Sequence, residues 1–147
     1  MNNISQIYDV KGDYDTALDY LDKSLKIRQQ IGDRQGEATT LHNIGGIYVA
    51  RKEYEKALEW IQASLNNNLH IGNIHGAAVS MDYIGMILFE HQQKPAPAIP
   101  YLLQAYQIFR QIGSPSIKST EHTLGAVIQE IGEARFREIM AEIQKEE

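Results

Sequence analysis

The 147-residue sequence repeats itself with an offset of 40 positions. Residues 3–36 and 43–76 are identical at 12 of 34 aligned positions, where average residue usage predicts about two. A third copy follows at an offset of 40 to 41, and a shorter fourth copy begins at Leu124-Gly125. A repeat of this length restricts the chain to architectures in which each unit buries its apolar face by stacking on its neighbours.

Each repeat contains two apolar stripes with helical spacing. In the second repeat, one stripe runs from Ala38 to Tyr48 and the other from Tyr54 to Leu65, with a polar turn at 51–53 between them. The predicted helices span residues 2–11, 14–31, 34–51, 54–71, 74–91, 96–112, 116–131 and 133–145. The predicted fold class is all-α, with about three and a half antiparallel helical hairpins stacked into a right-handed α-α superhelix.

Local signals mark where these helices end and where they approach each other. An Ile-Gly pair closes the second helix of each of the first three repeats, and glycine is a common helix stop. Asp33 is then a candidate N-cap for the next helix. Gly45 and Ala57 are small residues at positions where two helices must come close. The extra residue of the third repeat is expected to bulge the loop at 92–94, next to a proline cluster.

Composition argues against several classes of function. The formal net charge of −5 disfavours nucleic acid as a partner. The chain has no cysteine, and its five histidines lack a metal-ligand spacing. No apolar run approaches the ~20 residues that span a bilayer, and the N-terminus has no signal-peptide pattern. We therefore expect a cytoplasmic protein with no membrane partner, no cofactor and no metal.

The repeated residues resemble the tetratricopeptide repeat, whose pattern is W-x2-L-G-x2-Y followed by A-x3-F. The second repeat supplies Leu41, Ile44-Gly45, Tyr48, Ala57 and Ile61 at these positions. The period of 40 is similar to that of the long-period subclass, which includes the Pins/LGN spindle adaptors, kinesin light chain and many bacterial regulatory proteins. The resemblance covers 1–147 as a single domain, with a truncated repeat at 1–33, full repeats at 34–73 and 74–114, and a decayed capping repeat at 115–147.

The resemblance implies a noncatalytic scaffold that binds a peptide segment of a partner protein in a concave groove. In the family, the first helix of each repeat lines this groove. Carried over position by position, the expected groove residues are Asn3, Gln6, Thr39, His42, Asn43, Asp82, Tyr83, Met86 and His122. None of these is Lys or Arg, so we expect no clamp for a C-terminal carboxylate.

Asn43 is the sharpest candidate in this groove. Related repeat proteins use asparagine there to pair with a peptide backbone, and a carboxamide both donates and accepts hydrogen bonds. The alternative is that Asn43 bonds to its helix neighbours or to water. Tyr83, Met86 and Phe89 form a candidate apolar patch for a partner side chain. Alternatively, Met86 and Phe89 pack against the next repeat.

Other conspicuous residues have structural interpretations. The run Asn66-Asn67-Asn68 is predicted to lie on a solvated outer face, and Trp60 at the edge of the core. His42 and His122 occupy equivalent positions two repeats apart, roughly 20 Å at usual helix spacings, so they could not share a metal ion.

A final interpretation concerns the first repeat and the alternative function. Only two residues precede Asn3, whereas the equivalent helix of the second repeat starts nine residues before Asn43. We therefore expect a fragment or shortened member of a longer array, whose exposed stacking face favours a homodimer through the N-terminal end.

The alternative function is self-association or regulation within a larger signalling protein. An enzyme is not expected, because no nucleophile, base and oxyanion donor can be assembled.

Overall fold

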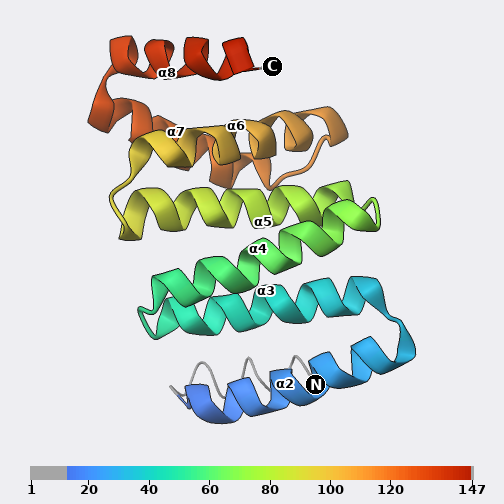
Figure 1. Ribbon diagram of the computed structural model, residues 1–147. Helices are drawn as coiled ribbons and strands as arrows, with labels where there is room; N and C mark the ends of the chain where they lie inside the picture. Colours follow the sequence, from blue (N-terminus) through green and yellow to red (C-terminus); the bar gives the residue numbers. More distant parts are fainter. Residues whose placement is uncertain (1–12, 147) are drawn as a thin grey trace. The chain divides into compact units, whose positions relative to one another are not determined.

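The computed structural model describes residues 13–146 and is all-α over that range, with no strand (Figure 1). The helices are Tyr14–Ile31 (α2), Arg34–Ala50 (α3), Tyr54–His70 (α4), Ile74–Met86 (α5), Pro95–Ile112 (α6), Ile117–Ile131 (α7) and Glu133–Glu146 (α8), with a π-helical segment at Ile87–His91 (η1) directly after α5. Six of the predicted helices are confirmed to within one residue at each end. The predicted helix at 2–11 lies outside the described residues.

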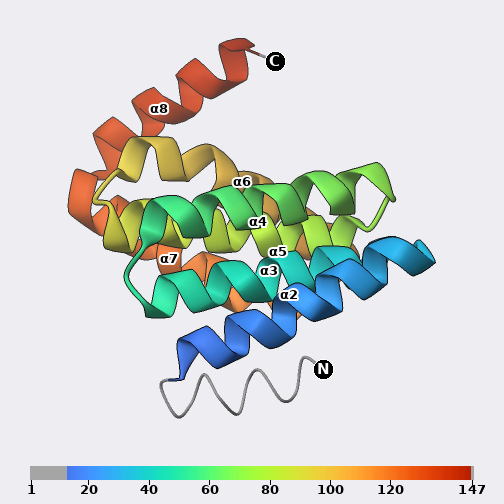
Figure 2. The same cartoon turned by 60° about the horizontal axis from the view of Figure 1, so that its bottom comes forward.

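Contacts between residues group into two compact units, Met1–Ser80 and Met81–Glu147, whose border falls inside α5. In the first unit, α2, α3 and α4 follow one another as antiparallel neighbours (Figures 1 and 2). In the second unit, α6 packs against α7, and α8 contacts both. Both units are thus built from the predicted antiparallel hairpins. No helix in the described range combines the length and apolarity needed to cross a bilayer.

Each unit has its own apolar core. The core of the first unit is formed by Ala17, Leu21, Leu25, Leu41, Ile44 and Ile47. Trp60 packs against its edge, as predicted, with its ring stacked on Tyr48 at a centroid distance of 6.5 Å. The core of the second unit is formed by Ala98, Ile99, Leu102, Leu124, Val127 and Ile139.

The helix boundaries follow the local signals in the sequence. Gly32, Gly72 and Gly113 have φ values of 74°, 75° and 70°, the left-handed region in which glycine ends a helix without steric cost. At the start of α3, the Asp33 carboxylate accepts a hydrogen bond of 2.9 Å from the Gly36 amide and a second one from Arg28. These two bonds lower the pKa of Asp33 below 3.8. The predicted N-cap is therefore present.

The extra residue of the third repeat lies in a helix and not in the following loop, which corrects the prediction of a bulge at 92–94. In the second repeat, the Arg51 amide donates to the Ile47 carbonyl four residues back. At the equivalent place, the Gln92 amide donates to the Ile87 carbonyl five residues back. Widening one helical turn into the π segment η1 accommodates the insertion. The turn itself is preserved, since Lys52 and Gln93 both have positive φ.

Candidate functional site

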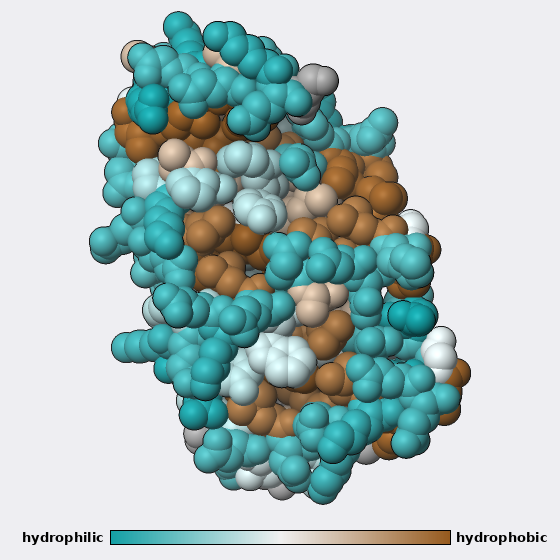
Figure 3. Space-filling model, viewed as in Figure 1, coloured by the Kyte–Doolittle hydropathy of each residue, from teal (hydrophilic) through white to brown (hydrophobic). Residues whose placement is uncertain are grey.

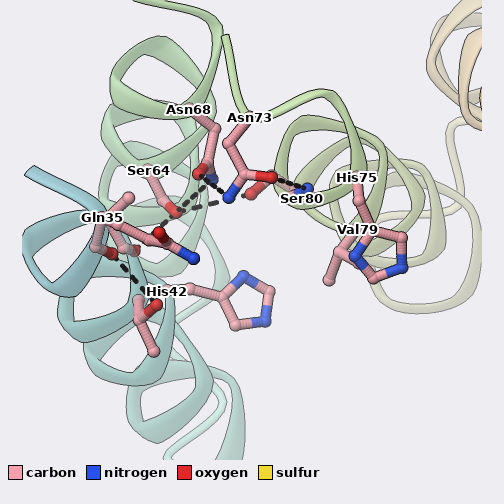
Figure 4. Close-up of a pocket in the computed structure, with 11 residues that line it drawn as sticks. Gln35, His42, Ser64, Asn68, Asn73, His75, Val79 and Ser80 are labelled. Atoms are coloured by element: carbon pink, nitrogen blue, oxygen red, sulfur yellow. Dashed lines mark hydrogen bonds between the residues drawn. The ribbon is translucent and has the colours of Figure 1, made fainter. Parts of the chain in front are cut away.

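A hollow of the first unit lies between α3, α4 and the start of α5 (Figure 4). This pocket has a volume of about 270 Å³. Its walls include Thr39 and His42 from α3 and His75 and Val79 from α5, and its floor includes Ser64 and Asn68 from α4. We call it the α3–α5 pocket. Its size is slightly below the ~300–1,000 Å³ of typical pockets for drug-sized ligands, so it suits a group of side-chain size.

A hydrogen-bond network of short polar side chains forms the floor of the α3–α5 pocket. Ser64 Oγ donates to the Ala38 carbonyl at 2.7 Å, and Ser80 Oγ donates to Ser64 Oγ at 3.4 Å. Asn73 Nδ2 donates to Asn68 Oδ1 at 3.1 Å, and Asn73 Oδ1 accepts from the Gly76 amide at 3.0 Å. Each bond places a neutral donor or acceptor at a defined position, so the floor is polar, ordered and uncharged.

The walls add no fixed charge to this floor. None of the residues that line the α3–α5 pocket is Asp, Glu, Lys or Arg. His42 is half-buried, and desolvation lowers the pKa of its imidazole below 6.5, so the ring is neutral near pH 7. The pocket can therefore pair with neutral hydrogen-bonding groups, and it has no Lys, Arg, Asp or Glu to balance a full charge.

The structure places the predicted groove residues of α3 on one side of that helix. Thr39 and His42 line the α3–α5 pocket, and the Thr39 hydroxyl donates to the Gln35 carbonyl at 3.1 Å. Asn43 is half-buried beside them, and no hydrogen bond from its amide to residues 13–146 is present. Asn3 and Gln6 lie outside the described residues. We call Gln35, Thr39, His42, Asn43 and Gly46 the α3 stripe.

The carboxylate of Asp82 is hydrogen-bonded within the protein. Its two carboxylate oxygens accept hydrogen bonds from Ser119 Oγ at 3.0 Å and from Thr120 Oγ1 at 2.9 Å, both on α7. Burial raises the pKa of Asp82 above 3.8, and the two hydroxyl bonds lower it only partly. Asp82 therefore joins two helices of the second unit, and a ligand would have to compete with α7 for it.

The raised pKa of Asp82 predicts a pH-dependent contribution to stability. Between pH 3.8 and the raised pKa, the folded state binds this proton more tightly than the unfolded state, so the free energy of unfolding falls as pH rises through that window. We expect Asp82→Asn to raise the free energy of unfolding near neutral pH by less than about 1.5 kcal/mol, the scale of one hydrogen bond. Denaturant titrations over a pH series should show this gain shrinking under acidic conditions. A constant difference at all pH values would contradict the assignment.

The other predicted groove residues of the second unit lie on α5 and α7, and none of them lines either of the two hollows described in residues 13–146. Tyr83 and Met86 are half-buried on α5, and His122 is exposed on α7. Phe89 packs against the core that contains Leu102. This core contains residues of both the third and the fourth repeat, and the apolar patch of Tyr83, Met86 and Phe89 stays a prediction.

The sequence interpretation missed Asn68. The run Asn66-Asn67-Asn68 was predicted to be solvated as a whole, but Asn68 is only 5% exposed and forms part of the pocket floor. Successive residues of a helix are rotated by about 100°, so three neighbours cannot share one face. The helical spacing in the sequence does indicate that Asn68 faces inward, because it follows the inward-facing Ser64 by four residues and Ile61 by seven.

A second, more apolar hollow of about 330 Å³ lies in the second unit along α8. Ile128, Phe136 and Met140 are among its lining residues. In Figure 3, hydrophilic residues cover the outer side of α8, and a hydrophobic strip lies beneath them. None of the predicted site residues lines this hollow.

Comparison with known proteins agrees with the repeat architecture. The family model described as tetratricopeptide repeat matches residues 1–70. A search of curated proteins finds no match. Within residues 13–146, no three His, Asp or Glu side chains cluster closely enough to hold a metal ion. The match over 1–70, together with helical hairpins in both units, supports a tetratricopeptide-repeat protein, a class whose repeats generally mediate contacts between proteins.

Proposed function

We propose that the chain binds an extended segment of a partner protein along the α3 stripe and the facing start of α5. The observation that carries this proposal is the α3–α5 pocket, which opens between two first helices of successive repeats and is lined by polar groups. A folded core does not need such a hollow. Tetratricopeptide repeats in general bind protein partners, which is consistent with a polypeptide as the ligand.

Asn43 is the residue we propose to hold the backbone of the bound segment. Its amide has one acceptor and two donor hydrogens, so it can accept a backbone N–H and donate to a backbone C=O at the same time. It lies four residues after Thr39, one helical turn away, so it is on the same side of α3 as that pocket-lining residue. Because such pairing uses only the backbone, it imposes little preference for partner sequence.

The test uses peptides selected from a random displayed library on the wild-type chain. We expect Asn43→Ala to weaken binding of the selected peptides by about 1–3 kcal/mol, the value of two hydrogen bonds, or roughly fivefold or more. Isothermal titration calorimetry measures the affinity. The melting temperature should stay unchanged, since the Asn43 amide forms no hydrogen bond to residues 13–146.

Asn66→Ala provides the matched control, because it removes the same amide from an exposed position on α4. We expect this variant to bind the selected peptides with wild-type affinity. Equal affinity of Asn43→Ala and wild type, or failure of the library to yield any binder, would argue against the proposal.

A further inference from the structure

The α3–α5 pocket differs from the equivalent place one repeat earlier. Arg28 and Asp33 form an ion pair there, at the junction of α2 and α3. Forty residues on, the same two positions hold Asn68 and Asn73, whose side chains are hydrogen-bonded to each other at 3.1 Å. Both charges of the pair have therefore been replaced by carboxamides, and the long arginine side chain by a short one. The position of Thr40 is likewise taken by the smaller Ser80.

The two glycines at these junctions show that the polar pairs are packed in the same way. A Cβ on Gly36 would lie 2.6 Å from Cδ of Arg28, and a Cβ on Gly76 would lie 2.7 Å from Oδ1 of Asn68. The helix N-terminus thus presses on the polar pair in both repeats. The pair at 68 and 73 is a neutral version of the ion pair at 28 and 33, built on the same backbone arrangement.

The neutral pair has hydrogen-bonding capacity left over. Each amide nitrogen carries two hydrogens. Asn68 uses one toward Ser64 Oγ at 3.5 Å, and Asn73 uses one toward Asn68. One N–H therefore remains on each amide, while the hydroxyl oxygens of Ser80 and Thr39 can still accept. A ligand that both accepts and donates at neighbouring atoms would satisfy these groups together.

We propose, building on the function proposed above, that the α3–α5 pocket binds a carboxamide side chain, Asn or Gln, of the partner segment and discriminates against the corresponding carboxylate. A carboxamide oxygen accepts from the amides of Asn68 and Asn73, and its NH2 group donates to the hydroxyls of Ser80 or Thr39. A carboxylate has no hydrogen to donate, and the pocket has no Lys or Arg to balance its charge, so its desolvation is poorly compensated. The volume of about 270 Å³ suits one such side chain.

The test uses two small probes that differ only in the group of interest: N-acetyl-glutamine methylamide and N-acetyl-glutamate methylamide. Each is titrated to millimolar concentration near neutral pH, and side-chain NH2 resonances of the 15N-labelled chain are followed by NMR. We expect saturable shifts of the Asn68 and Asn73 NH2 signals with the glutamine probe, and binding at least about tenfold weaker with the glutamate probe. Equal binding of the two probes, tighter binding of the glutamate probe, or no saturable shift with either would overturn the proposal.

The double variant Asn68→Arg/Asn73→Asp is the matched control. It installs the ion pair that the chain already uses at the junction of α2 and α3, so the variant is expected to fold, which its melting curve verifies. We expect it to lose the response to the glutamine probe. A retained response would overturn the proposal. The two proposals can fail independently. If Asn43→Ala weakens peptide binding but the glutamine probe does not bind, only the carboxamide proposal fails. If the glutamine probe binds but Asn43→Ala binds peptides like wild type, only the function proposed above fails.

Discussion

Truncation of Ile61 to alanine is expected to lower the free energy of unfolding by about 2–5 kcal/mol. Ile61 lies at the middle of α4, is 0% exposed and fits against the backbone of α3 at Gly45. Removing three carbons there leaves a cavity that neighbouring helices cannot fill without moving. Domains of this size are usually stable by only about 5–15 kcal/mol, so the loss should be a large fraction of the total. Denaturant titration followed by circular dichroism measures it.

The same substitution at Ile31 controls for the change of residue type. Ile31 ends α2 and is 69% exposed, so Ile31→Ala removes little buried surface. We expect a change within about 0.5 kcal/mol. A similar loss at both positions would mean that α4 does not pack on α3 as described.

Gly45→Ala and Gly85→Ala are expected to be the next most damaging changes. A Cβ on Gly45 would lie 2.4 Å from Cγ1 of Ile61, and one on Gly85 would lie 2.5 Å from Cγ of Leu102. Both opposing side chains are fully buried and cannot move aside. Overpacking of this kind costs about 1–3 kcal/mol, and the better helix propensity of alanine offsets up to about 1 kcal/mol. Thermal and denaturant unfolding should both show the loss.

Gly125 is the natural control, because it stands at the equivalent position of the fourth repeat. A Cβ added to Gly125 would have no atom of another helix within 4 Å in the described part of the chain. We therefore expect Gly125→Ala to raise the free energy of unfolding by about 0.5–1 kcal/mol. The pair Gly45→Ala and Ile61→Ala should be less than additive, since the smaller side chain removes the clash. A stabilising effect of alanine at all three glycines would contradict the close helix contacts.

The helices could be predicted from sequence because each boundary depends on local chemistry. The apolar spacing fixed which residues face inward, and the Ile-Gly pairs at 31–32, 71–72 and 112–113 placed the ends of α2, α4 and α6. The π segment η1 could not be placed in this way. An extra residue can widen a helical turn or lengthen a loop, and the choice depends on keeping the turn at Gln93 and the packing of Ile87 intact.

The candidate site was predictable only in part. Thr39 and His42 followed from their register on α3, since a repeat pattern determines which side of a helix a residue occupies. Asn68 was missed because three consecutive asparagines suggest a solvent-exposed surface. Only Asn68 of the three faces inward. The hydrogen bonds of Asp82 to Ser119 and Thr120 depend on the packing of α7, which lies 37 and 38 residues away in sequence. Nothing local to Asp82 indicates them.

The central claim, that a partner segment lies along α3 and the start of α5, is tested most directly by mapping a selected peptide onto the chain. Backbone amide shifts in 15N NMR spectra give this map at residue resolution. The account predicts that the largest shifts fall on residues 39–43 of α3 and 75–79 of α5, with small shifts around Asn66 on the exposed side of α4. Shifts concentrated on the exposed residues of α4, with α3 unaffected, would contradict it.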